Sequence, residues 1–278
     1  MIYNINRRKF LGLFTCSCCG IALPSCSSVP ITDRKQLSIF SETRINAQAN
    51  AAYESFRQKT KLITKGKDLD LVRTIGKDIE TSVSVFFKNE NKKDPTTAFT
   101  WDYILVDNDK VKNAWCMPGG KIAVYTGLLK ITKNKHALAA VMGHEIAHAV
   151  AKHSVERMSQ AMTINIGTAV ADIFLQGAIS KTRNTVGKNT GFDIISIGIT
   201  NPFGRVQETE ADYLGLIFSS LAGYDIREAA KLWERMSADK KGKEVPQFLS
   251  THPSSKKRID NLNKWVAEVM IKYPPIPR

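Results

Sequence analysis

The HEIAH motif at residues 144–148 limits most strongly what this chain can fold into and do. It lies in a run of helix-forming residues from Asn134, the expected N-cap, to about His153. On a helix, positions i and i+4 share one face, so His144 and His148 can both bind one Zn²⁺. Glu145 would then accept a proton from the attacking water. The alternative is two ordinary core histidines, but burying them unpaired beside a carboxylate would cost several kcal/mol.

A zinc hydrolase usually has three protein ligands, so a third must come from elsewhere in the chain. Residues 205–216 (RVQETEADYLGL) have a helical pattern that places Glu208 and Asp212 on one face and Glu210 on another. Glu208 is the candidate third ligand of a single Zn²⁺, and Asp212 would accept the second N–H of a zinc-bound histidine. A solvated acidic face is the alternative. The missing ligand and the excess of positive charge favour the metal site.

Several motifs in one order resemble a known family of zinc metallopeptidases. HEIAH followed by ETEAD is similar to the HtpX and CAAX-prenyl-protease type, in which the first Glu of ExxxD completes the metal site. The segments NAWCMPGGKI (113–122), YTGL (125–128), AGYD (222–225) and THPS (251–254) resemble its periplasmic LoiP/BepA-like branch, without the helical-repeat extension. The mitochondrial inner-membrane stress peptidase is a cousin. The resemblance covers roughly residues 69–269, and Gly204 and Lys135-His136 depart from it without removing a ligand.

The resemblance implies an α+β fold, namely a mostly helical zincin domain of the gluzincin type with a small β-sheet or hairpin lining the cleft. The residue pattern agrees, because hydrophobic residues recur at helical spacing from Leu69 to Phe87. Strands are predicted over Trp101–Val106, Val111–Met117 and Lys121–Tyr125, with a hairpin at 107–110 joining the first two.

The strand that contains Asn113 and Ala114 is a candidate substrate-binding element. In relatives this strand lines the cleft and pairs with an extended peptide, which would be β-augmentation. The resemblance therefore implies that Asn113, Ala114 and Gly119 bind substrate. An ordinary hairpin strand is the alternative. Cys116, on the same strand, is interpreted as a small buried hydrophobic residue.

A third histidine, His252, precedes a last amphipathic helix that Ser254 or Ser255 would cap. A histidine before a proline is more often structural than catalytic. The resemblance brings this one toward the zinc as a catalytic residue, where it would stabilise the oxyanion or occupy zinc's open position as an inhibitory ligand. His136 and His153 lack ligand spacing and are interpreted as structural.

The N-terminus predicts the compartment. Residues 1–25 combine RRKFL with an apolar stretch too short to span a membrane, which indicates a removed signal peptide with the export route left open. LPSC at 23–26 resembles a lipoprotein box, in which Cys26 would carry the lipid anchor. The expected location is the bacterial periplasm, attached to the outer membrane by lipidated Cys26, with a soluble periplasmic or inner-membrane-anchored form as the alternative. Residues 26–60 would form a tether and lead-in helix, and 61–278 the metallopeptidase domain.

The chain is strongly basic, with a formal net charge of +14. Removing residues 1–25 subtracts Arg7, Arg8 and Lys9 and no acidic residue, which leaves 14 − 3 = +11. Such a charge favours anionic lipid, lipopolysaccharide or acidic protein partners, while export and the protease motifs argue against nucleic acid. Residues 161–180 are largely apolar, and a helix with a loop covering the cleft as a lid is favoured there over a membrane hairpin.

Together these features predict a zinc-dependent metalloendopeptidase of the bacterial envelope, acting in quality control on unfolded or misassembled envelope proteins. One alternative is a noncatalytic or latent chaperone-like binding module that holds outer-membrane clients. Another is a metallohydrolase with a non-peptide substrate. The complete HExxH motif and Glu208 favour the endopeptidase.

Overall fold

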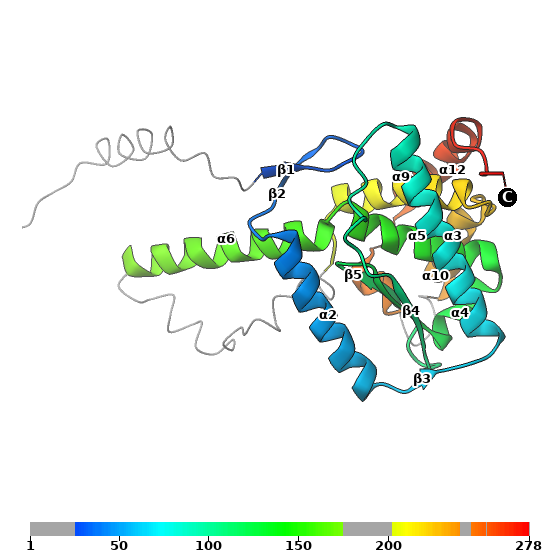
Figure 1. The fold of residues 1–278 in the computed structure, drawn as a ribbon, viewed down its shortest axis with the longest axis horizontal. Helices are drawn as coiled ribbons and strands as arrows, with labels where there is room; N and C mark the ends of the chain where they lie inside the picture. Colours follow the sequence, from blue (N-terminus) through cyan, green and yellow to red (C-terminus); the bar gives the residue numbers. More distant parts are fainter. Residues whose placement is uncertain (1–25, 175–201, 240–245, 254, 278) are drawn as a thin grey trace, which may run out of the picture.

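The computed structural model describes residues 26–174, 202–239, 246–253 and 255–277 (Figure 1). Within them the strands are β1 (Cys26–Ser28), β2 (Lys35–Leu37), β3 (Leu62–Ile63), β4 (Asp102–Val106), β5 (Ala114–Met117) and β6 (Lys121–Tyr125). The helices are α2 (Glu42–Lys59), α3 (Lys67–Asn89), α4 (Thr126–Thr132), α5 (Lys135–Val150), α6 (His153–Phe174), α9 (Arg205–Leu221), α10 (Glu228–Asp239), α11 (Phe248–Thr251) and α12 (Lys256–Lys272). The predicted α+β class, mostly helical with a small sheet, is confirmed.

Helix α5 forms the centre of the core. Asn134 caps it, as expected, by accepting a hydrogen bond from the Ala137 N–H at 2.9 Å. From Ala137 to Val150 nearly every residue of α5 is buried, because α3, α9, α10 and β5 all pack around it. Polar side chains on such a helix lie away from water and must find partners inside the protein.

Two glycines allow α5 and α9 to cross in close contact. A Cβ atom on Gly215 of α9 would lie 2.9 Å from the His144 backbone nitrogen, and one on Gly143 would lie 2.9 Å from the Gly215 carbonyl oxygen. Both distances are shorter than an ordinary van der Waals contact. The crossing therefore needs glycine on both helices, and it brings the HEIAH helix against the ETEAD helix.

The sheet has the strand order β3-β4-β6-β5, which corrects the predicted hairpin at 107–110. Strand β6 lies between β4 and β5, parallel to the first and antiparallel to the second. The tight turn is the one after Met117, where Gly119 and Gly120 have φ of 84° and 81° and the Gly120 N–H bonds the Met117 carbonyl. Glycine adopts such angles without strain, so the reversal occurs there. Strand β5 lies at the edge of this sheet and starts at Ala114 rather than at Val111.

The chain turns sharply between α5 and α6. The helix expected to reach about His153 ends at Val150, and Lys152 adopts a left-handed φ of 60° before α6 begins at His153. The turn leads His153 back toward α5. Helix α6 then extends away from the body of the protein (Figure 1). No helix in the described part of the chain is long and apolar enough to cross a membrane. The loop predicted to cover the cleft as a lid lies outside the described residues.

The segment 26–60, predicted as a tether and lead-in helix, packs on the rest of the molecule. Strands β1 and β2 pair as an antiparallel hairpin, and Val29 between them is fully buried in the main core. Helix α2, capped by Ser41, lies against the sheet, where Tyr53 contacts Trp115 edge to face with a centroid distance of 6.2 Å. The proposed signal peptide lies outside the described residues.

Candidate metal centre

Four buried side chains from three parts of the chain converge at one point. His144 and His148 come from α5, Glu208 from the first turn of α9, and His252 from the end of α11. One nitrogen or oxygen of each lies within 4.8 Å of the others, so the four could hold a metal ion. The structure thus brings together the three residues predicted as zinc ligands and His252, which the resemblance had placed near the zinc.

The distances among these atoms match the size of a metal coordination shell. His144 Nε2 lies 3.0 Å from His148 Nε2 and 3.6 Å from Glu208 Oε2, and Glu208 Oε1 lies 3.4 Å from His148 Nε2. His252 Nδ1 lies 2.9 Å from Glu208 Oε1 and 3.1 Å from His144 Nε2. Ligands of a tetrahedral Zn²⁺ with bonds of about 2.1 Å would be about 3.4 Å apart.

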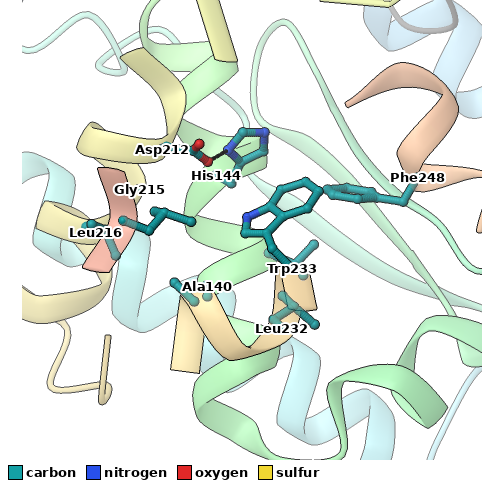
Figure 2. A pocket seen from close by; sticks show the side chains of 11 residues that line it. Ala140, His144, Asp212, Gly215, Leu216, Leu232, Trp233 and Phe248 are labelled. Carbon is teal, nitrogen blue, oxygen red and sulfur yellow. Dashed lines mark ion pairs between the residues drawn. The ribbon is translucent and has the colours of Figure 1, made fainter. Parts of the chain in front are cut away.

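Asp212 contacts His144 on the side away from the other candidate ligands, and Arg258 of α12 contacts both residues. Asp212 Oδ1 lies 3.0 Å from His144 Nδ1 beside an apolar pocket that includes Trp233 (Figure 2). Arg258 donates to both Asp212 oxygens at 2.5 and 2.7 Å, and its Nη1 lies 2.5 Å from Glu208 Oε2. Burial raises the pKa of Asp212 to about 6 although Arg258 opposes the shift. At neutral pH Asp212 is therefore a carboxylate that accepts from His144.

His148 is supported differently, by His153, which was predicted to be structural, and by Glu210, which was predicted to face away from Glu208. His148 Nδ1 lies 2.8 Å from His153 Nδ1, and His153 Nε2 lies 2.9 Å from Glu210 Oε2. Burial lowers the pKa of His153, so its ring is neutral, with the proton on the nitrogen that faces the Glu210 carboxylate. His153 Nδ1 then accepts from His148 Nδ1–H. Glu210 does point away from Glu208 and Asp212, as predicted, and it points toward His153.

These hydrogen bonds fix the tautomers of both motif histidines and provide a test of metal binding. His144 and His148 each carry a proton on Nδ1, so each directs an Nε2 lone pair at the other across 3.0 Å. Burial keeps the pKa of both rings well below the usual value, so neither adds a second proton. Two opposed lone pairs beside a carboxylate fit a metal ion between them, and this donor set suits Zn²⁺.

Glu145 lies between β5 and His252. Burial raises its pKa to about 7, although the nearby His252 ring and a hydrogen bond from the Cys116 backbone N–H lower it. Its Oε1 is 3.2 Å from His252 Nε2 but has no hydrogen-bond partner of good geometry among the described residues. A buried carboxylate with one unsatisfied oxygen and a pKa near neutrality is suited to general-base catalysis.

Aromatic rings enclose the histidines on two sides. Phe203, just before α9, stacks on His148 with a centroid distance of 3.8 Å, and Phe248 stacks on His252 at 4.4 Å. The Arg157 guanidinium lies 3.6 Å above the Phe203 ring, and burial lowers the pKa of Arg157 to about 10. These residues could not be predicted from the sequence, because nothing in their spacing links them to the HEIAH helix.

The predicted substrate-binding residues lie along β5 and its turn. Asn113 is half-buried, with its side chain accepting from the Ala114 N–H at 3.0 Å and its carbonyl accepting from the Tyr125 N–H at 3.1 Å. Ala114 is buried, and a side chain at Gly119 would contact Asn46 of α2. Their role in substrate binding stays a prediction. Cys116 is buried as predicted, and burial raises the pKa of its thiol.

Two crossing helices that bring HExxH and ExxxD motifs to one buried point define a metal-dependent peptidase. The chain belongs to peptidase family M48, which matches residues 77–266. It is 39% identical to the fission yeast (Schizosaccharomyces pombe) mitochondrial metalloendopeptidase OMA1 over 62% of this chain and 48% of that protein. It is 29% identical to the Saccharomyces cerevisiae mitochondrial metalloendopeptidase OMA1 over 96% of this chain and 76% of that protein. The beta-barrel assembly-enhancing protease of Escherichia coli is 26% identical over 56% of this chain and 32% of that protein.

These relatives confirm a metallopeptidase and correct the predicted location. The chain spans about half the length of the fission yeast relative, and the matches do not single out the periplasmic LoiP/BepA-like branch. The predicted bacterial periplasm with outer-membrane attachment through Cys26 is wrong, since the fungal, plant and animal relatives it matches are mitochondrial metalloendopeptidases. The prediction failed because a basic leader without acidic residues is common to secretory signals and mitochondrial transit peptides.

Proposed function

We propose that this chain is a zinc-dependent endopeptidase that cleaves misfolded or misassembled proteins. The observation that carries the proposal is the buried convergence of His144, His148 and Glu208, with both histidine lone pairs aimed at one point and Glu145 beside it. Zn²⁺ bound there would polarise the peptide carbonyl and lower the pKa of water.

The residues of the chain account for the remaining chemistry. Glu145, with its raised pKa, would take a proton from water and deliver it to the leaving amine. Asp212 and Arg258 hold His144 and Glu208 in place through charge-assisted hydrogen bonds. Edge strand β5, whose Cys116 N–H contacts Glu145, supports the proposal that an extended peptide binds along Asn113, Ala114 and Gly119.

The position of His252 favours the inhibitory role over the oxyanion role. Its Nδ1 lies among the candidate ligand atoms and its Nε2 lies 3.2 Å from Glu145, so the same ring contacts the metal site and the general base. A water or a substrate carbonyl cannot occupy that position at the same time. We propose that the described state is a resting state and that His252 must move before substrate binds.

The role in quality control and the identity of the substrates rest on the relatives. OMA1 is named a metalloendopeptidase, and the Escherichia coli relative is named a beta-barrel assembly-enhancing protease. Both names describe proteases, and the second links that protease to the assembly of beta-barrel proteins. The chaperone-like alternative shares this fold and differs from the proposal only in the absence of hydrolysis.

The test is hydrolysis of an unfolded protein by the zinc-loaded chain. Glu145→Gln should retain zinc and lose turnover by a factor of about 10² or more, which is the range for a general base. Glu234→Gln, an exposed change of the same type on α10, is the matched control and should be fully active. Equal cleavage by the Glu145→Gln variant would refute the mechanism. Binding of the unfolded protein without cleavage by the wild type would favour the chaperone-like alternative.

A further inference from the structure

We propose that the N-terminal hairpin, through Thr32 and Arg34, completes the support of the zinc ligand His148 and so sets the affinity of the metal site. The proposal rests on the metal site of the proposed function and extends it to a segment more than a hundred residues away in sequence. It assigns His153, Glu210, Arg34 and Thr32 as positioning residues.

The contacts run without a break from the hairpin to the metal site. Arg34 Nε donates to Glu210 Oε2 at 3.0 Å, and the Thr32 hydroxyl donates to Glu210 Oε1. Glu210 accepts from His153 Nε2, and His153 accepts from His148 Nδ1. Both oxygens of Glu210 are thereby held by the hairpin, so its carboxylate has one orientation in which to meet the His153 ring.

The two motif histidines are supported in different ways. His144 contacts a carboxylate directly through Asp212, whereas His148 reaches one only through a second imidazole. A carboxylate behind a zinc-bound histidine fixes the ring and raises its basicity. Because the His153 ring lies between His148 and the carboxylate, the orientation of His148 depends both on His153, which is fully buried, and on Glu210.

Arg34 also links the hairpin to helices α6 and α9, which contain the residues of this series of contacts. Its Nη1 and Nη2 donate to the two oxygens of Glu156 on α6, each at 2.8 Å. Gln207 of α9 donates to the same Glu156 at 2.7 Å. A bidentate Arg–carboxylate pair is geometrically specific, so Arg34 fixes α6, which begins with His153, relative to α9, which carries Glu210.

The hairpin is itself anchored, which allows it to act as a support. Val29 is fully buried, its N–H bonds the Arg34 carbonyl at 2.8 Å, and its carbonyl accepts from the Asp33 N–H at 3.0 Å. Asp33 adopts a left-handed φ of 54° in this turn. Thr32 and Arg34 are therefore presented to α9 by a short closed turn rather than by a free tail.

The test is the zinc dissociation constant of the purified chain, measured by competition with a chelator. Residues that hydrogen-bond the ligands of a metal typically contribute about 10 to 100-fold to metal affinity, so Glu210→Gln should weaken zinc binding by that factor. Arg34→Ala and Thr32→Val should weaken it by about 3 to 10-fold, because each leaves the other donor in place. Arg227→Ala is the matched control, since Arg227 pairs with Asp225 on the surface, and its zinc affinity should equal that of the wild type.

A double-mutant cycle separates positioning from general stabilisation. The combined Arg34→Ala and His153→Gln variant should lose less zinc affinity than the two single losses multiplied together, because both act through Glu210. Unfolding of the zinc-free proteins by urea, followed in parallel, reports stability alone. A variant such as Thr32→Val that lowers stability but leaves the zinc dissociation constant unchanged would overturn the proposal. So would a cycle in which the effects of Arg34→Ala and His153→Gln on zinc affinity simply multiply. A wild-type chain that binds no zinc would overturn the proposed function as well, whereas unchanged affinity in the variants would overturn this inference alone.

Discussion

The close crossing of α5 and α9 makes Gly215→Ala a test of how the fold builds the site. The new Cβ would lie 2.9 Å from the His144 nitrogen, 3.0 Å from its Cα and 3.1 Å from the Gly143 carbonyl carbon. Ordinary contacts between such atoms are about 3.5 to 4.0 Å, so the helices must separate by about half an ångström or more. All three atoms are backbone, and no side-chain rotation relieves the contact.

The magnitude follows from two opposing effects. Overpacking of this kind costs about 1 to 3 kcal/mol, and replacing a helical glycine by alanine returns up to about 1 kcal/mol. We expect Gly215→Ala to lower the free energy of unfolding by about 1 to 2 kcal/mol and to weaken zinc binding, because the shift separates Glu208 from His144. Urea unfolding of the zinc-free protein and chelator competition measure the two effects. Thr209→Ala, on the exposed face of α9, is the control. A Gly215→Ala variant as stable as the wild type, with equal zinc affinity, would refute the reasoning.

Two further predictions concern His252 and pH. His252→Ala should bind zinc and hydrolyse an unfolded protein several-fold faster than the wild type, because it removes a ring that contacts both the candidate ligand atoms and Glu145. A loss of about 10² to 10³ in turnover would instead assign His252 to stabilisation of the oxyanion. Burial raises the pKa of Glu145 from 4.5 to about 7, so in zinc-free protein this residue destabilises the fold increasingly as pH rises through that interval. Zinc-free Glu145→Gln should therefore exceed the wild type in unfolding free energy by up to about 3 kcal/mol at pH 8, with the advantage disappearing toward pH 4.5. An advantage that does not change with pH would contradict the assigned pKa.

The candidate metal ligands could be predicted from the sequence because they lie in short motifs whose spacing determines their geometry. HExxH and ExxxD each place side chains on one helical face by spacing alone, and Asn134 marks the start of α5 by its capping chemistry. The C-terminal end of α5 and the pairing of the strands were harder to predict from the sequence. Lys152 has no feature that predicts a left-handed residue, and Asp107-Asn108-Asp109-Lys110 resembled a hairpin although the glycines at 119 and 120 make the turn.

The supporting residues were missed because they are long-range partners. Glu210 was correctly predicted to point away from Glu208, but nothing in the sequence showed that the turn after α5 would place His153 there. Arg34 and Arg258 lie on other elements, and isolated arginines in a basic chain give no signal of burial. Local patterns thus predict which residues are candidate metal ligands, while tertiary packing decides which residues contact and orient them.

The most direct test of the central claim is the zinc content of the purified chain and of Glu208→Ala, determined by elemental mass spectrometry after exposure to zinc and removal of the unbound metal. We predict about one Zn²⁺ per wild-type chain, since His144, His148 and Glu208 supply the usual three protein ligands. Glu208→Ala should lose most of it. A wild-type chain without zinc, or a Glu208→Ala variant that retains the full amount, would contradict the assignment of the metal centre.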